Sequence, residues 1–460
     1  MTTSSSSRRE FLKRSSVLSL AGSAAPWALN LAAISEAAAQ SATDYKALVC
    51  VFFYGGNDHG NTLVPYDQST YDSYATLRST LATARSALDG TVLIPAAGAE
   101  LPNSRQYALA PQLSALKPVF DAGRLGVLLN IGPLSQITSK AEYNARSVPL
   151  PPRLFSHNDQ QSTWQASSPE GSTSGWGGRI GDLMASGNGQ SVFTAVSVTG
   201  NAVYLSGRSA VQYQVTSNGS VPINGIGSTL YGSAAAAQAL RSLITSTPGT
   251  NLFEREHARV VQRSVDADVA LLSALGGIAP LTTAFPATGL GSQLSMVARM
   301  IAARNAVAAK RQVFFVGIGG FDTHDKLADN HPLLLTQIGG ALAAFDAAMV
   351  ELGTSQQVTA FTASDFGRTL SSNGDGSDHG WGSFHFVSGG AVRGRRFFGQ
   401  APLPGNNGPD DVGQGRMLPT MAVDQLAATL ATWMGVTGTD LTTVVPGIGN
   451  YTVKDLGLFA

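Results

Sequence analysis

Residues 357–390 begin Gln357-Val-Thr-Ala-Phe-Thr-Ala-Ser-Asp-Phe-Gly-Arg-Thr369 and end Ser377-Asp-His-Gly-Trp-Gly-Ser-Phe-His-Phe-Val-Ser-Gly-Gly390. An apolar, β-branched run stops at Ser364-Asp365, and a glycine-rich loop then leads to Asp378 and His379 before a second apolar run at Phe386. In α/β proteins, polar sites form where short polar side chains follow the carboxyl ends of parallel strands. The stretch therefore predicts buried strands with a polar site at their ends.

Two other apolar runs end in the same way. Val51 to Tyr54 leads into Gly55-Gly56-Asn57-Asp58, and Val313 to Ile318 leads into Gly319-Gly320-Phe321-Asp322-Thr323-His324. Strand ends cluster in space in a parallel sheet, so these polar groups are expected to meet. The candidate metal ligands are carboxylates and imidazoles, namely Asp58, Asp322, His324, Asp365, Asp378 and His379.

The composition indicates a loop-rich globular protein. Hydrophobic residues make up 43% of the 460, charged residues only 13%, and 51 are glycine. Beyond the N-terminus no apolar run reaches the roughly 18 residues that span a bilayer, so we expect no stable membrane span in the mature protein. The single cysteine, Cys50, has no intramolecular partner and is expected to be a buried apolar residue.

The charge balance leaves no excess of positive charge for binding a polyanion. Lys plus Arg and Asp plus Glu each number 30. Residues 1–39 hold four basic and two acidic side chains, so the remainder has 26 basic against 28 acidic groups. Without an excess of positive charge, nucleic acid is not expected as a partner.

The N-terminus has the tripartite order of an export signal. Ser7-Arg8-Arg9-Glu10-Phe11-Leu12-Lys13 is followed by a mildly apolar stretch from Val17 to Ile34 and by Ala37-Ala38-Ala39. Paired arginines, a weakly apolar core and small residues before the cut resemble a twin-arginine signal over residues 1–39. The resemblance implies that the twin-arginine translocation machinery is a partner and that the mature protein is periplasmic or extracellular.

Residues 40–460 are expected to form a single α/β domain with loop-rich insertions around residues 135–250, because no repeat or composition break occurs after the signal. Continuous apolar runs predict buried parallel strands, and a period of about 3.6 residues predicts helices between them. The predicted strands cover 47–54, 125–131, 313–318 and the run from 358, with short strands at an edge or in a small cap between 193 and 221. The predicted helices cover 110–122, 251–275, 292–310, 332–352 and 423–434.

Asp322-Thr323-His324 is the sharpest local signal for a metal site. A carboxylate and an imidazole two residues apart, just beyond a strand, can bind one cation. The alternative is an Asp that caps the following turn and a His that hydrogen-bonds to it. The strand-end Asp365 and the pair Asp378-His379 favour the metal site.

Several other residues have two interpretations each. Asp58 is either a further ligand or a turn residue after two glycines. Arg368 either clamps an anionic substrate or pairs with Asp365. His157 and Asp159 either reach the substrate or tie their own loop together.

Two further histidines are considered as candidate site residues. His385 alternates with Phe384 and Phe386 in a strand-like run, so it either faces the site in place of His379 or packs in its strand. His257 lies on a helix face rich in Glu and Arg and is expected to be solvated. Motifs for other chemistries are missing from the sequence, namely Gly-x-Ser-x-Gly, a Walker phosphate loop, a complete Gly-x-Gly-x-x-Gly and cysteine-based metal patterns.

The motifs together resemble the bacterial family called domain of unknown function 1501. They are Gly55-Gly-Asn-Asp58, Asn61-Thr-Leu-Val-Pro65, Phe321-Asp-Thr-His324, Ser364-Asp-Phe-Gly-Arg-Thr369, Asp378-His-Gly-Trp-Gly382 and Gly389-Gly-Ala-Val-Arg-Gly394. The resemblance covers essentially the whole mature chain. The family looks like a remote branch of the alkaline phosphatase and sulfatase superfamily. It implies an α/β fold, an alkaline-phosphatase-like three-layer sandwich with a mostly parallel central sheet, and one or two divalent metal ions at the carboxyl ends of its strands.

The superfamily resemblance also implies roles for single residues. Asp322, His324 and His379 resemble one metal site, and Asp365 with Asp58 resembles the other. The chain departs from the superfamily because Asp365-Phe366 stands where Asp-His is usual, and Asp-x-His stands where Asp-x-x-x-His is usual. The helix start that carries the nucleophile has no clear counterpart near Ala110-Pro111, and the nearby hydroxyl candidates are Thr62 and Ser104.

Two functions are consistent with these residues. The first is an exported metal-dependent hydrolase of phosphate or sulfate esters, in which Asp365, Arg368 and Thr62 are catalytic candidates. His157, Asp159 and Asn61 would then contact the substrate. The second is a non-catalytic binding or secretion-associated protein that keeps the same fold.

Overall fold

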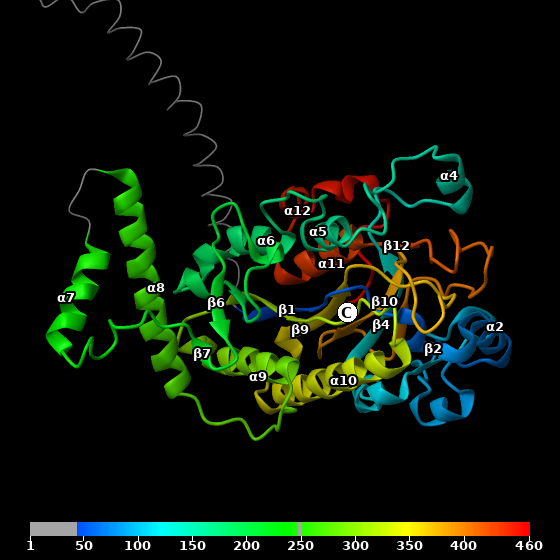
Figure 1. Ribbon diagram of the computed structural model, residues 1–460, viewed down its shortest axis with the longest axis horizontal. Helices are drawn as coiled ribbons and strands as arrows, with labels where there is room; N and C mark the ends of the chain where they lie inside the picture. The colour runs from blue at the N-terminus through cyan, green and yellow to red at the C-terminus, as the bar shows by residue number, and fades with distance from the viewer. Residues whose placement is uncertain (1–43, 247–250) are drawn as a thin grey trace, which may run out of the picture.

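A computed structural model describes residues 44–246 and 251–460, and the predicted export signal, residues 1–39, lies outside this part of the chain. Its centre is a ten-stranded sheet with the strand order β11-β4-β10-β9-β1-β8-β5-β6-β7, and β12 pairs with β4 (Figure 1). The strands are β1 Lys46–Phe53, β4 Leu125–Gly132, β5 Ala195–Ser197, β6 Tyr213–Thr216, β7 Gly219–Ser220, β8 Arg311–Ile318, β9 Val358–Ser364, β10 Ser383–Ser388, β11 Arg396–Phe398 and β12 Met421–Ala422. A separate antiparallel pair joins β2 Leu63–Pro65 and β3 Tyr107–Leu109.

The register of the central strands sets where the polar loops begin. β1 pairs in parallel with both β8 and β9, and Phe53 is the partner of Ile318 on one side and of Ser364 on the other. The three strands therefore end at the same level of the sheet. β10 is antiparallel to β9 and to β4, so its first residue, Ser383, lies at the edge where those strands end.

Alternate residues of the central strands enter the two cores. In β1, Val49, Val51 and Phe53 belong to one hydrophobic cluster, whereas Cys50 and Phe52 belong to the other. This follows from the period of two that points successive side chains to opposite faces of a strand. The prediction that Cys50 is buried is confirmed.

Helices cover both faces of the sheet, which gives three layers (Figure 1). One face is covered by α9 Gly289–Ala302 and α10 Leu327–Glu351, with η5 Pro111–Leu116 and α3 Lys117–Asp121. The other is covered by α5 His157–Ala166, α6 Trp176–Met184, α11 Val423–Met434 and α12 Asp440–Val444. The predicted three-layer sandwich with a mostly parallel sheet is confirmed.

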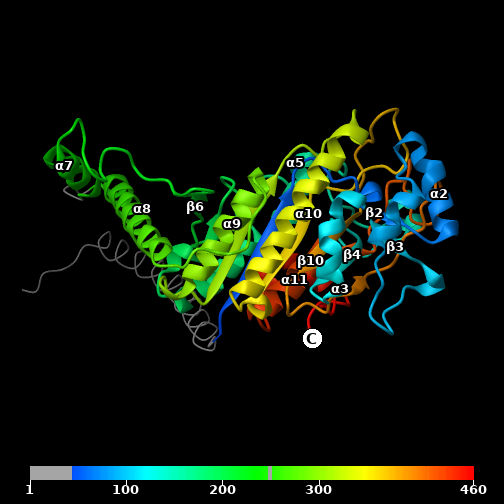
Figure 2. The same ribbon diagram turned by 90° about the horizontal axis from the view of Figure 1, so that it is seen from below.

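The remaining helices lie outside these layers. They are α2 Gln68–Arg78, α4 Lys140–Ala145, α7 Ala234–Thr245 and α8 Leu252–Gly276. Figures 1 and 2 show that α7 and α8 project as an arm from the end of the sheet that carries β6 and β7. Of the two alternatives for the short strands between residues 193 and 221, an edge or a small cap, the structure shows the edge.

The start of α10 differs from the prediction. The helix begins at Leu327, whereas the sequence pattern placed its start at Pro332. Proline inside a helix removes one backbone hydrogen bond, so the extra turn needs outside support. The loop before β10 supplies it, because Leu327 N–H donates to the Asp375 carbonyl at 3.0 Å and Lys326 N–H donates to the Asp375 carboxylate at 3.2 Å.

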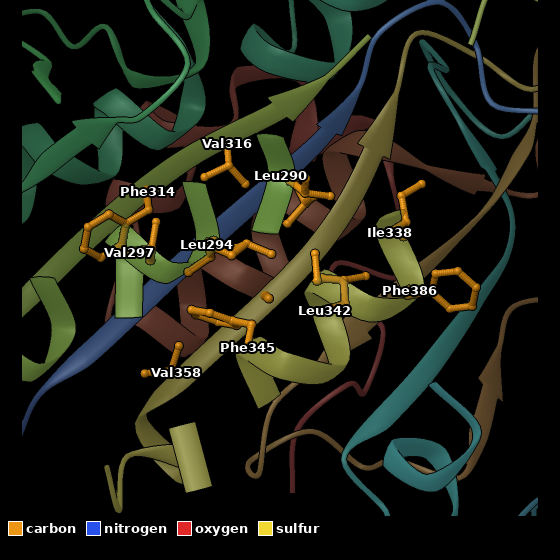
Figure 3. Packing of buried hydrophobic residues seen from close by; sticks show 14 of the residues in the cluster. Leu290, Leu294, Val297, Phe314, Val316, Ile338, Leu342, Phe345, Val358 and Phe386 are labelled. Atoms are coloured by element: carbon orange, nitrogen blue, oxygen red, sulfur yellow. The ribbon is translucent and has the colours of Figure 1, made fainter. Parts of the chain in front are cut away.

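Among the described residues, α10 is the one helix long and apolar enough to cross a bilayer. Core helices of other proteins pass the same test, and here α10 packs on the sheet. Figure 3 shows Ile338, Leu342 and Phe345 of α10 beside Leu290, Leu294 and Val297 of α9, facing Phe314, Val316, Val358 and Phe386 of the strands. Burying each such side chain contributes about 1.5–3 kcal/mol.

We expect Leu342→Ala to lower the free energy of unfolding by about 2–5 kcal/mol, because it leaves a cavity between α10 and the sheet. Leu333→Ala on the same helix is the matched control. Leu342 is 4% exposed and Leu333 is 65% exposed, so the control should change stability by less than about 0.5 kcal/mol. Urea unfolding followed by tryptophan fluorescence measures both. Equal losses would contradict the packing of α10.

Candidate metal centre

Acidic and imidazole side chains from four segments meet at the carboxyl ends of the central strands. Asp322 and His324 follow β8, and Asp365 follows β9. His379 comes from the loop before the antiparallel β10, which starts at this edge. His157 is the first residue of α5, a helix that packs against β9. Segments far apart in the sequence thus build one cluster.

Asp322 lies at the middle of this cluster. Its Oδ1 is 3.1 Å from His324 Nε2 and 3.3 Å from His379 Nε2. Its Oδ2 is 3.5 Å from His157 Nε2. The side chain of Asp322 is 46% exposed, so the centre of the cluster is open to solvent.

The other ring nitrogen of each histidine has an acceptor. His379 Nδ1 donates to the Phe155 carbonyl at 2.8 Å, and His157 Nδ1 donates to Asp365 Oδ2 at 2.6 Å. His324 Nδ1 is 3.2 Å from Asp378 Oδ1. Carbonyl and carboxylate oxygens only accept hydrogen bonds, so these partners assign the ring proton to Nδ1. In the neutral rings, all three Nε2 lone pairs then face Asp322.

This donor set fits a divalent cation. Histidines that bind metals typically donate their second ring N–H to a carboxylate or a backbone carbonyl, as these three do. Two ligand atoms about 2.1 Å from one ion stand roughly 3.4 Å apart in tetrahedral geometry. The Nε2 atoms of His324 and His379 are 2.8 Å apart, and the ligand atoms of His157, Asp322 and His379 all lie within 4.8 Å of one another.

The local environment sets the protonation of the cluster. Burial lowers the pKa of His379, which keeps its Nε2 lone pair available. The hydrogen bond to Asp365 raises the pKa of His157. Burial alone would raise the pKa of Asp322, but the hydrogen bond and the positive charge of Arg368, together with the attraction of His157 and His324, outweigh burial and lower this pKa.

Asp365 contacts His157 through the ring nitrogen, Nδ1, that does not face Asp322. Its Oδ2 accepts hydrogen bonds from His157 Nδ1, from Gly55 N–H at 3.1 Å and from Gln161 Nε2 at 2.7 Å. The carboxylate is fully buried. Asp365 therefore positions His157, and its oxygens are not among the atoms that face Asp322.

Arg368 pairs with Asp322 and not with Asp365. Its Nη1 donates to Asp322 Oδ1 at 2.9 Å and to the Gly55 carbonyl at 3.0 Å, and its Nε donates to the Ser377 carbonyl at 3.1 Å. The side chain is 0% exposed. A guanidinium engaged in this way orients Asp322, which does not support its predicted role as a substrate clamp.

The structure places Asp58 and Thr62 away from this cluster. Asp58 forms a buried ion pair with Arg78 of α2, and both side chains are inaccessible to solvent. Thr62 Oγ1 donates to the Asp58 carbonyl at 2.8 Å and is also buried. Burial excludes both from contact with a substrate, so neither the predicted ligand role of Asp58 nor the predicted nucleophile role of Thr62 is supported.

Asn61 and Asp159 also have structural partners. Asn61 accepts a hydrogen bond from the Tyr74 hydroxyl at 2.6 Å and donates to the Leu81 carbonyl at 2.8 Å, which ties η1 His59–Asn61 to α2. Asp159 is buried and accepts from Ser156 Oγ at 3.0 Å at the start of α5. Of the two interpretations of this loop, His157 belongs to the cluster and Asp159 ties the loop.

His385 is buried in β10, where its Nδ1 is 3.1 Å from Thr362 Oγ1. The histidine that joins the cluster is thus His379 and not His385.

Two residues that support the cluster were not predicted from the sequence. Gln161 lies four residues after His157 on α5, a spacing that places both on one helix face and could have been used. Asn373 donates to Asp378 Oδ1 at 3.0 Å from an irregular loop, and no sequence pattern indicates it.

Comparisons with known proteins identify a family and no activity. A model of the family described as "Protein of unknown function (DUF1501)" matches residues 45–448. A search of curated proteins finds no match. Similar solved structures are Ps i-CgsB in complex with k-i-k-neocarrahexaose (8% identity, TM-score 0.36, 87% of this chain and 74% of that chain) and the PsFucS1 sulfatase from Pseudoalteromonas sp. (10%, 0.33, 88% and 71%). A third concerns the metabolism of multiple glycosaminoglycans by Bacteroides thetaiotaomicron (10%, 0.33, 88% and 74%). These identities and TM-scores are too low to assign an activity to this chain.

Arg78→Met is expected to lower the free energy of unfolding at pH 7 by about 3–5 kcal/mol, because it leaves the Asp58 carboxylate buried without a partner. In the wild type, burial would raise the pKa of Asp58, but the charge of Arg78, together with the weaker attraction of His331, His59 and Arg368, outweighs burial and the pKa is lowered. The stability from this pair is therefore present above the ordinary Asp pKa of about 3.9 and is lost as the pH falls through the folded-state pKa. In Arg78→Met, burial without a partner raises the pKa of Asp58, so the carboxyl takes up a proton as the pH falls towards 4 and its cost is relieved, whereas the wild-type pair is still ionised there. Urea unfolding at pH 7 and pH 4 should therefore show the difference between the two proteins narrowing in acid.

The control is the double variant Asp58→Asn with Arg78→Met. It removes both charges, so it should recover much of the stability that the single variant loses. If the double variant is as unstable as Arg78→Met alone, the loss is one of packing and the buried charge is not its cause.

Proposed function

We propose that this chain, which belongs to the DUF1501 family of proteins of unknown function, holds a divalent metal ion at Asp322 and acts as a metal-dependent hydrolase of phosphate or sulfate esters. One observation carries the proposal. Three imidazoles from separate segments direct Nε2 at one solvent-open carboxylate while their Nδ1 atoms are each next to an acceptor. A hydrogen-bonding network needs no such common orientation, whereas a cation site does.

The proposed ligands are Asp322 and the Nε2 atoms of His157, His324 and His379. Three nitrogens and one carboxylate suit zinc and other divalent transition metals better than calcium or magnesium, which prefer oxygen ligands. A divalent ion held there supplies Lewis acidity that polarises an ester oxygen. The ester class follows from the motif resemblance to the alkaline phosphatase and sulfatase superfamily.

The chain's own groups prepare this site. Arg368 keeps Asp322 ionised and fixes its orientation. Asp365 and Gln161 hold the His157 ring, and the Phe155 carbonyl holds the His379 ring. Because Thr62 is buried, a water molecule and not a hydroxyl side chain would attack the ester.

We expect the mature protein, purified without chelator, to contain about one equivalent of a divalent metal. Asp322→Asn and His379→Ala should lose it, because each removes a proposed ligand. Metal affinity should also fall as the pH decreases through the raised pKa of His157, since protonation occupies its Nε2. Elemental analysis and metal titration at several pH values measure both effects.

His257→Ala is the matched control, because His257 is exposed on α8 and is not part of the cluster. It should retain the full metal content. A folded wild-type protein that binds no zinc, manganese, iron or cobalt would refute the metal site. A metal-loaded protein that fails to hydrolyse p-nitrophenyl phosphate and p-nitrophenyl sulfate would remove the hydrolase and leave the non-catalytic binding role.

Export by the twin-arginine pathway is a further part of the proposal. Replacing Arg8 and Arg9 together by Lys is expected to keep the protein in the cytoplasm, because the paired arginines are the recognised feature of the signal. Fractionation and immunoblotting of the full-length chain measure this. Arg14→Lys, outside the pair, should export normally. An unchanged distribution of the double variant would contradict the signal.

A further inference from the structure

A hollow of about 540 Å³ lies at the base of the arm, between the end of α8 and α9. We refer to it as the α8–α9 pocket. Its walls come from the end of α8, residues 277–287, one face of α9 and the turn between β6 and β7. Ligand pockets typically measure roughly 300–1,000 Å³. The pocket shares no lining residue with the metal centre.

The lining of the α8–α9 pocket has an apolar wall and a polar wall. The apolar wall includes Leu275, Ile278 and Phe285. The polar wall is the helix face of α9 that carries Ser292, Ser295 and Arg299, which are three and four residues apart and so lie in one row. An occupant must therefore have an apolar side and a polar side.

Arg299 is the one ionisable side chain among the residues that line the pocket. The structure shows no hydrogen bond or ion pair between its side chain and any residue of 44–246 or 251–460. No carboxylate lines the pocket to balance it. A half-buried guanidinium beside an apolar wall favours an anion, because a charge-assisted, bidentate contact with a carboxylate matches its geometry.

The walls of the pocket are fastened to the body of the protein. The Glu351 carboxylate at the end of α10 accepts hydrogen bonds from Thr282 N–H at 2.6 Å and from Thr283 N–H at 2.9 Å. Gln293 of α9 bonds through both ends of its amide to Gly317 of β8, at 2.9 and 3.0 Å. The pocket is thus built in advance of any ligand, which reduces the ordering cost of binding.

We propose that the α8–α9 pocket binds a small monocarboxylate with an apolar tail. The carboxylate contacts Arg299, the serines of α9 supply further hydrogen bonds, and the tail covers the apolar wall. One guanidinium matches one negative charge. Inorganic phosphate leaves the apolar wall uncovered, and a neutral alcohol leaves the guanidinium without its partner.

The test is calorimetric titration of the full mature chain with octanoate, 1-octanol, acetate and inorganic phosphate. We expect octanoate to bind, and to bind at least about tenfold more tightly than the other three probes. Arg299→Gln should weaken octanoate binding at least about tenfold, because the variant loses a charge-assisted contact. Arg263→Gln, an exposed arginine of α8, is the matched control and should leave binding unchanged.

Three outcomes would overturn the proposal. They are an absence of octanoate binding to the folded wild type, equal binding of octanoate and 1-octanol, and equal binding of octanoate and acetate. The last would indicate an adventitious anion only. An unchanged unfolding midpoint for Arg299→Gln shows that a loss of binding is not a loss of fold, and Ser295→Ala, with a smaller expected loss, provides a second variant of the same wall.

Discussion

The close approach of three loops at the carboxyl ends of β1, β8 and β9 is the constraint on which the site depends. These strands end in register, so the residues after Phe53, Ile318 and Ser364 start from one level. Gly55 makes the approach feasible: its φ is +115°, and a Cβ there would lie 2.4 Å from the Asp322 backbone nitrogen. In return, its N–H binds Asp365 and its carbonyl binds Arg368. One glycine thus fixes two of the groups behind the cluster.

Two buried arginines divide the strand-end carboxylates into two kinds. Arg78 closes over Asp58, and neither is accessible, so their pairing is structural. Arg368 is buried beneath Asp322, so the side chain of Asp322 stays 46% exposed. The other contacts of Asp322 are to imidazoles. The same charge pairing therefore yields a stabilising contact in one place and a solvent-open ligand in the other. The outcome depends on whether other side chains cover the carboxylate, as they do at Asp58, or leave it open to solvent, as at Asp322.

Helix α9 connects the two candidate sites to the fold. Its apolar face, with Leu290, Leu294 and Val297, packs on the sheet that also positions the cluster (Figure 3). Its row of Ser292, Ser295 and Arg299 faces the α8–α9 pocket. An amphipathic helix ordinarily turns its polar face to water, but here residues 277–287 line an open hollow beside that face and leave it half-buried.

The sequence alone determined the buried strands, most of the helices, the expected meeting of Asp322, His324 and His379, and the family, because alternation, helical periodicity and the residues after each strand are local properties. Only the tertiary structure decided that His157 enters the cluster while Asp159 does not. It also decided that Asp58 forms an ion pair with Arg78 and that Arg368 pairs with Asp322. Finally, it showed that β10 runs antiparallel, so that His379 and not His385 lies at the cluster. These choices depend on which side of a helix or loop packs against a distant strand. That packing is settled by the burial of the whole core, and no single stretch of sequence records it.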